Sequence, residues 1–232
     1  MHIFIERNEY LMSSSSIFIY ELVASNASIA TDIYNSIKEF QEDEHNYFNL
    51  QLVSSNELTG EYVIVQNVEE IYYNAEQRTF DTRIAPRANV IHFDIFNNRL
   101  EIWSNKSNAH RLVFTLSNLL SQISINAIEI SLKDIIHKLQ FQKVKISKVC
   151  FEDFLFTEDI VGNFSVDLSS YGDAFSVLKK YQDKIARMTI ILPYNDTSLR
   201  ISLTAKGSVT VYKSRDLLDD DAINLLHDIL LK

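Results

Sequence analysis

The sequence predicts an α+β protein built from two related halves, each an antiparallel sheet with amphipathic helices on one face. Three observations favour this class. Short runs of alternating apolar and polar residues, typical of strands, recur along the chain and are separated by turn-forming Asn, Asp and Ser. Between them lie segments whose apolar residues recur every three or four positions, as in helices packed on a sheet. Two stretches 109 residues apart share one pattern, which indicates an internal repeat.

The first half, residues 1–121, is expected to hold one sheet and two helices. Alternation predicts a strand over residues 16–23. A helix follows, capped by Asn26 or Ser28, and its apolar face is formed at helical spacing by Ile29, Ile33, Ile37 and Phe40. Further strands of an antiparallel sheet are expected over residues 47–53, 61–66, 68–73, 89–95 and 99–104. Regularly spaced leucines over residues 108–120 predict the closing amphipathic helix.

A connection over residues 122–141 leads to the second half, residues 142–232. The connection is expected to hold a strand over 125–130 and a short helix from Ser131, where Ser131 and Asp134 resemble a capping box. The second half is expected to form strands over 144–151, 163–168, 188–192, 199–204 and 208–213. One helix runs through Phe175, Leu178, Tyr181 and Ile185, and another closes the chain over 222–230.

The repeat is clearest where residues 99–106 (RLEIWSNK) overlie residues 208–215 (SVTVYKSR), because apolar, polar and aromatic classes coincide. Duplication and convergence on a common strand-helix unit both explain the match. This order of elements resembles the TATA-binding-protein fold, a saddle of two such repeats. The resemblance lies in element order alone, and it implies that each sheet has one face covered by helices and one open face. Function does not follow from such an outline.

Strand alternation predicts which side chains lie on each face of these sheets. Seven apolar residues are expected to point toward the helices: Ile91, Phe93, Ile95, Leu100, Ile102, Val209 and Val211. The alternate positions then form an open face that suits a protein partner, with binding residues His92, Asp94, Glu101, Trp103 and Tyr212. The alternative is that the other half or a loop covers Trp103.

Charge argues against nucleic acid as the main partner. The chain has a net charge of −9, and residues 1–121 hold 8 Lys and Arg against 16 Asp and Glu. Such a field repels phosphate backbones at long range. A local basic segment nevertheless runs through Lys133, Lys138, Lys143, Lys145 and Lys148. Lys143, Lys145 and Lys148 are therefore candidate contacts for a nucleic acid, and the alternative is a solvated surface.

The sequence offers little for catalysis, and we expect no cofactor, no metal and no enzyme. Four Gly and two Pro leave no glycine-rich phosphate loop, and the six His lack metal-ligand spacing. His92 and Asp94 could form an acid-base pair with Glu101, but a surface polar cluster explains them equally. Cys150, the single cysteine, lies in an apolar strand and is expected to be a structural thiol. A metal-dependent enzyme therefore ranks last among the functions considered.

Together these observations predict a non-catalytic protein-interaction or adaptor subunit. The partner is expected to be another protein or a second copy of the chain, with a nucleic-acid-binding module as the alternative. No signal sequence or membrane-spanning run is evident, so a cytoplasmic location without membrane contact is expected. Abundant Asn, Ile, Lys and Ser point to a bacterial or phage-encoded assembly.

Overall fold

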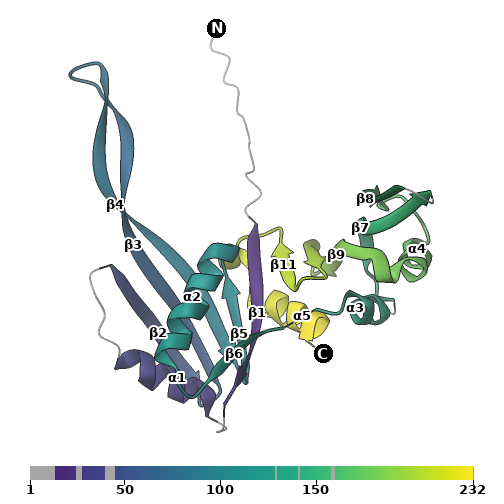
Figure 1. Ribbon diagram of the computed structural model, residues 1–232, viewed down its shortest axis with the longest axis horizontal. Coiled ribbons are helices and arrows are strands. Elements are labelled where there is room, and N and C mark those ends of the chain that lie inside the picture. The colour runs from purple at the N-terminus through teal and green to yellow at the C-terminus, as the bar shows by residue number, and fades with distance from the viewer. Residues whose placement is uncertain are drawn as a thin grey trace. The chain divides into compact units, whose positions relative to one another are not determined.

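The computed structural model describes residues 14–24, 28–39, 45–128, 130–140, 142–157 and 160–231 of the chain (Figure 1). The chain divides into two compact units, Ile17–Ile128 and Glu129–Lys232.

The unit Ile17–Ile128 is a sheet with two helices. Its strands are β1 (Ser15–Val23), β2 (Asn46–Ser54), β3 (Glu57–Asn74), β4 (Thr79–Phe96), β5 (Arg99–Trp103) and β6 (Ser124–Ala127), and its helices are α1 (Ile29–Lys38) and α2 (Lys106–Leu119). The strand order is β2-β3-β4-β5-β1, and β6 also pairs with β1. All of these pairings are antiparallel.

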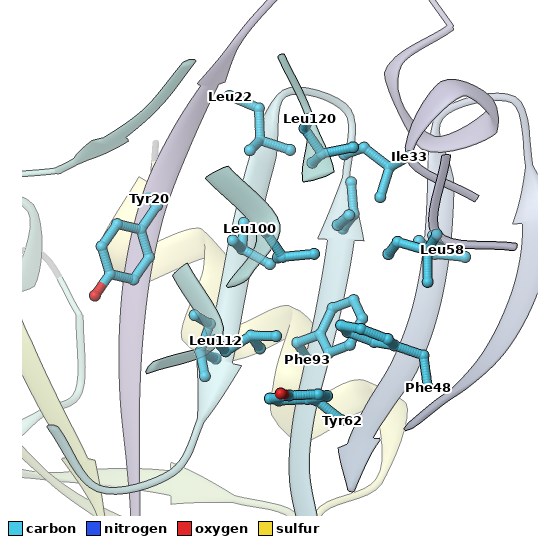
Figure 2. Close-up of a cluster of buried hydrophobic side chains, with 14 of the residues drawn as sticks. Tyr20, Leu22, Ile33, Phe48, Leu58, Tyr62, Phe93, Leu100, Leu112 and Leu120 are labelled. Atoms are coloured by element: carbon cyan, nitrogen blue, oxygen red, sulfur yellow. The ribbon is translucent and has the colours of Figure 1, made fainter. Parts of the chain in front are cut away.

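The core of this unit lies between the sheet and the two helices (Figure 2). Ile33 and Leu112 bring α1 and α2 onto the same apolar cluster as Leu100. The expected inward direction of Ile91, Phe93, Ile95, Leu100 and Ile102 is confirmed, because all five are buried in this cluster. The helical face of Ile29, Ile33 and Ile37 is confirmed in the same way. The expected members Asn26 and Phe40 lie outside the described residues.

Aromatic packing fixes the middle of this core. The rings of Phe48 and Tyr62 stack with centroids 4.5 Å apart, and Phe93 meets Phe48 edge to face at 6.3 Å. Gly60 lies directly opposite Phe93 on the neighbouring strand. A Cβ atom at Gly60 would lie 2.6 Å from Phe93 Cζ and 2.8 Å from Leu50 Cδ2. The ring therefore occupies the space that any other residue at position 60 would need.

The other unit combines a second set of strands with three helices. Its elements are α3 (Leu132–Leu139), β7 (Lys145–Thr157), β8 (Ile160–Asp167), α4 (Ala174–Lys180), β9 (Ile185–Tyr194), β10 (Thr197–Thr204), β11 (Ser208–Val211) and α5 (Asp220–Leu231), with short 3-10 turns η1 (Gln182–Lys184) and η2 (Arg215–Leu217). The strand order is β11-β10-β9-β7-β8. Ser131 caps α3 by accepting a hydrogen bond from the Asp134 backbone N–H, as expected. Val209 and Val211 are both fully buried, and their direction toward the helices stays a prediction.

The predicted fold class is wrong. The structure is mostly strand, at 51% against 28% helix, and it does not clearly form two halves with helices packed on one face of each sheet. Alternation along a strand is local information, so it cannot say how helices are distributed over a sheet. The boundaries proposed at residues 121 and 142 stay a prediction.

Two element predictions also need correction. Residues 61–66 and 68–73 belong to one strand, β3, because Asn67 continues the ladder opposite Pro86. The predicted helix through Ile185 stops at Lys180, since the Tyr181 backbone leaves the helical region at φ −122° and ψ 23°. Ile185 instead begins β9.

Candidate interaction surface

The β3-β4 hairpin extends well beyond the sheet of its unit (Figure 1). Each strand has 18 residues, but β2 pairs with β3 only as far as Ile64, and β5 pairs with β4 only from His92. Residues 66–87, here called the arm, therefore have strand partners only in each other within the described part of the chain. At about 3.4 Å per residue, the arm reaches about 30 Å from the sheet.

Local hydrogen bonds shape the end of the arm. The Asn74 side-chain oxygen accepts from the backbone N–H groups of Glu76 and Gln77, at 3.2 and 3.3 Å. The amide of Asn74 also donates to the Asp81 carboxylate across the hairpin at 2.8 Å. Arg78 completes the turn in the left-handed region at φ 53°. Asn makes such a turn without glycine because its side chain replaces the missing backbone partner.

One face of the arm is polar and carries its own ion pairs. Glu70 Oε2 lies 3.2 Å from Arg83 Nη2, and Glu70 Oε1 lies 2.9 Å from Arg87 Nε. Hydrogen bonds from Arg87 and then Arg83 hold the pKa of Glu70 below its usual range. The Arg83 guanidinium also sits 5.4 Å from the ring centroid of Tyr72. Asp81, opposite Tyr72, lies on the same face, so two carboxylates balance the two guanidinium groups there.

The opposite face of the arm is apolar and open to solvent. Opposite residues in an antiparallel pair lie on the same face, so the pairs Ile71–Thr82, Tyr73–Phe80 and Glu69–Ile84 share it. The exposed fractions of the large apolar residues are 75% for Ile71, 54% for Tyr73, 76% for Phe80 and 75% for Ile84. The rings of Tyr73 and Phe80 contact each other across the strands, with centroids 5.3 Å apart.

Such a surface is unusual for a strand pair. A contiguous exposed apolar patch marks an interaction site or an aggregation liability, whereas single exposed apolar residues are ordinary. An isolated two-stranded hairpin is only marginally stable in water, since it cannot bury a hydrophobic face. A partner that covered Ile71, Phe80 and Ile84 would supply the missing burial.

The predicted open face of the sheet carries a different, polar arrangement. His92 Nδ1 lies 3.3 Å from Glu61 Oε1, and the Asn49 amide donates to Glu61 Oε2 at 3.2 Å. Thr59 donates a hydrogen bond to Asp94 Oδ1 at 2.7 Å. These cross-strand contacts engage the two predicted site residues of β4 within the sheet.

Glu101 and Trp103 lie where alternation placed them but do not form an exposed surface. His92 is directly opposite Trp103, and Asp94 is directly opposite Glu101, so the expected shared face is confirmed. Trp103 is only 5% exposed, however, and Glu101 only 3%. The expectation of an open face at these two residues is wrong, because alternation assigns a side of the sheet and not the solvent exposure of that side.

Tyr212 follows β11 and is exposed. The Arg200 guanidinium lies over the Tyr212 ring, 5.0 Å from the ring centroid, so Tyr212 already makes a cation–π contact. Tyr212 and Trp103 belong to different units.

The three candidate lysines for a nucleic acid are all exposed. Lys148 nevertheless lies directly opposite Asp167 in the β7-β8 ladder. Hydrogen bonds from Ser169 lower the pKa of Asp167, and the charges of Lys145 and Lys148 lower it further. Asp167 therefore offsets part of the positive charge that a phosphate would meet.

Among the residues that the structure describes, no three His, Cys, Asp or Glu side chains gather as metal ligands. Within the same residues, no helix has both the length and the apolar character needed to span a bilayer.

Cys150 Sγ lies 3.0 Å from Ser165 Oγ on the neighbouring strand. No protein-family model and no curated protein matches the chain.

Sequence reasoning missed the arm. The expected strands leave out residues 74–88, although Phe80, Thr82 and Ile84 alternate with the charged residues Asp81 and Arg83. Two alternating segments on either side of a short polar turn are typical of a hairpin. This signal was available in the sequence, whereas the position of the arm beyond the sheet was not.

Proposed function

We propose that this protein is a non-catalytic interaction subunit that binds a protein partner through the apolar face of the arm. The observation that carries the proposal is the exposed set of Ile71, Tyr73, Phe80 and Ile84 on one side of a projecting hairpin. The buried core of a protein interface is enriched in aromatic residues such as Tyr and Phe, and a few such residues carry most of the binding energy. Composition favours a bacterial or phage-encoded assembly in the cytoplasm.

The two faces of the arm have different roles: the apolar face binds the partner, and the polar face keeps the arm soluble. Glu70 pairs with both Arg83 and Arg87 on the polar face, and these charged groups keep that face hydrated without a partner. The apolar face carries one charge, Glu69, at its inner end. An amphipathic ribbon of this kind is suited to lie flat against a protein surface, with only one side covered.

Site-specific photocrosslinking in the native host tests this function. A photoreactive phenylalanine analogue at position 80 should capture a protein, whereas the same analogue at position 72, on the opposite face, should not. Tyr72 is the matched control because it is an aromatic residue of the same arm and is 40% exposed. Equal capture from positions 72 and 80, or none from either, would contradict the proposal.

Nucleic-acid binding is the competing function, and salt separates the two. Neutralising several phosphates with Lys143, Lys145 and Lys148 releases counterions, so affinity would fall steeply as salt is added. Burial of the apolar face should respond only weakly to salt. The carboxylate of Asp167 beside Lys148 weighs against the phosphate interpretation.

A further inference from the structure

We propose that the partner of the arm is a second copy of this chain, with the apolar faces of two antiparallel arms packed against each other. The inference rests on the proposed function, because it names the occupant of the same surface. Three features of the arm support it: the area of the face, its symmetry and its charge.

The apolar area is close to what a specific dimer requires. A large side chain removes about 150–250 Å² from solvent when fully covered, so four side chains that are 54–76% exposed offer about 500 Å² per arm. Two arms would then bury about 1,000 Å² in total, near the lower limit for a specific interface. We therefore expect a dissociation constant in the micromolar range, and a dimer in exchange with the monomer.

The order of residues on the face is self-complementary. The pair Ile71–Thr82 lies midway between Glu69–Ile84 at the inner end and Tyr73–Phe80 at the outer end. A two-fold axis across the arms at this pair places Ile71 beside Ile71 of the second copy. The same axis places Phe80 beside Ile84 of the second copy.

The single charge on the face selects the antiparallel arrangement. With antiparallel arms, Glu69 meets the outer end of the second arm, where the Tyr73 hydroxyl can donate a hydrogen bond to its carboxylate. With parallel arms, Glu69 would instead meet the apolar Ile84 of the second copy. A carboxylate buried without a hydrogen-bond donor is costly, so the parallel arrangement is disfavoured.

Net charge favours the same arrangement. The arm holds four acidic residues against three arginines, whereas residues 1–121 as a whole hold 16 acidic against 8 basic. Like charges on the two copies therefore repel mainly outside the arms. Antiparallel arms centred on Ile71 separate the inner ends of the two arms by about 34 Å, well beyond the screening length of about 8 Å at physiological salt.

Disulfide trapping in the full-length protein tests the geometry directly. In a Cys150→Ser background, Ile71→Cys and Thr82→Cys should each form a disulfide-linked dimer under mild oxidation. Tyr72→Cys, one position along the strand but on the polar face, is the matched control and should link at least 10-fold more slowly. Equal rates at positions 71 and 72 would overturn the proposal.

Sedimentation velocity of the unlinked protein supplies the second readout. The wild-type protein should dimerise at micromolar concentration, Phe80→Ser should weaken dimerisation at least 10-fold, and Tyr72→Ser should leave it unchanged. Circular dichroism should show that both variants are folded, because both side chains lie outside the core. A dimer that survives Phe80→Ser would refute the arm as its interface.

The outcomes also separate this inference from the proposed function. A wild-type protein that stays monomeric up to several hundred micromolar refutes the second copy as the partner. If position 80 still captures a different protein in the photocrosslinking experiment, the interaction function stands with another partner. If position 80 captures neither a second copy nor another protein, both proposals fall.

Discussion

Replacing Gly60 with Ala should destabilise the unit Ile17–Ile128 by overfilling its core. The added Cβ would lie 2.6 Å from Phe93 Cζ, 2.9 Å from Phe93 Cε1 and 2.8 Å from Leu50 Cδ2. Cβ atoms essentially never lie within 3.0 Å of such neighbours, so the Phe93 ring or the backbone of β3 must shift. Phe93 is itself fully buried and packed edge to face on Phe48, which leaves the ring little room to move.

The magnitude follows from two opposing effects. Overpacking a well-filled core costs about 1–3 kcal/mol. Replacing Gly in a strand with Ala returns about 0.5–1 kcal/mol by reducing the conformational entropy of the unfolded chain. We therefore expect Gly60→Ala to lower the free energy of unfolding by about 1–2 kcal/mol.

Chemical denaturation followed by tryptophan fluorescence measures this change. Trp103 is the only tryptophan of the chain and lies in the same unit as Gly60, so its emission reports the unfolding of that unit. Gly172→Ala is the control for the substitution itself, because a Cβ there meets no atom within 4 Å, and its unfolding is followed by circular dichroism because Gly172 lies in the other unit. Adding Phe93→Leu to Gly60→Ala should recover part of the loss by shortening the side chain that the Cβ meets. A Gly60→Ala protein as stable as the wild type would refute the packing argument.

Three further outcomes are expected. Trp103→Ala should cost about 3–5 kcal/mol of folding free energy, because the residue is buried. For the same reason the emission of native Trp103 should be blue-shifted and resistant to quenchers, and a red-shifted, quenchable emission would show that Trp103 is exposed. The hydrogen bond from Tyr194 to Asp219 raises the pKa of Tyr194 from 10.0 to about 12 and lowers that of Asp219 from 3.8. Its contribution to folding stability should therefore be constant between pH 4 and 10. The contribution should be lost as pH falls through the pKa of Asp219 or rises toward 12. Tyr194→Phe should therefore move the Asp219 titration, followed by NMR, to higher pH, and an unchanged titration would mean that the contact does not form in solution. Arg87→Gln should raise the pKa of Glu70, because the hydrogen bond from Arg87 is the largest cause of its lowered pKa. A Glu70 carboxyl titration, followed by NMR, that matches that of the wild type would count against the ion pair.

The apolar core was readable from the sequence because it depends on local periodicity. Ile29, Ile33 and Ile37 share a helical face in any amphipathic helix, and Leu100 and Ile102 share a strand face in any half-buried strand. These patterns hold wherever a helix and a sheet pack together. They are independent of how many strands the sheet has or which strands join it, and for this reason the two-halves architecture was wrong although the core residues were right.

The candidate interaction surface was harder to predict because it depends on exposure. Trp103 and Glu101 have the alternation of an open face, yet both are buried. Ile71 and Phe80 have the alternation of a buried face, yet both are exposed. Strand periodicity is the same in both cases, so only the extent of each strand's pairing decides which side chains meet solvent. That extent is a long-range property, fixed for β3 by where β2 begins, at Asn46 opposite Ile64.

The unequal support along β3 means that this one strand should open in two separate steps. Leu58, Tyr62 and Ile64 are buried between two neighbouring strands, so their amide protons should exchange with solvent only when the whole unit unfolds. Amides near Tyr72, which have one neighbouring strand, should exchange through local fraying of the hairpin. Covalent continuity thus does not make β3 a single cooperative element, and a protease that cuts the outer turn should leave the inner sheet intact.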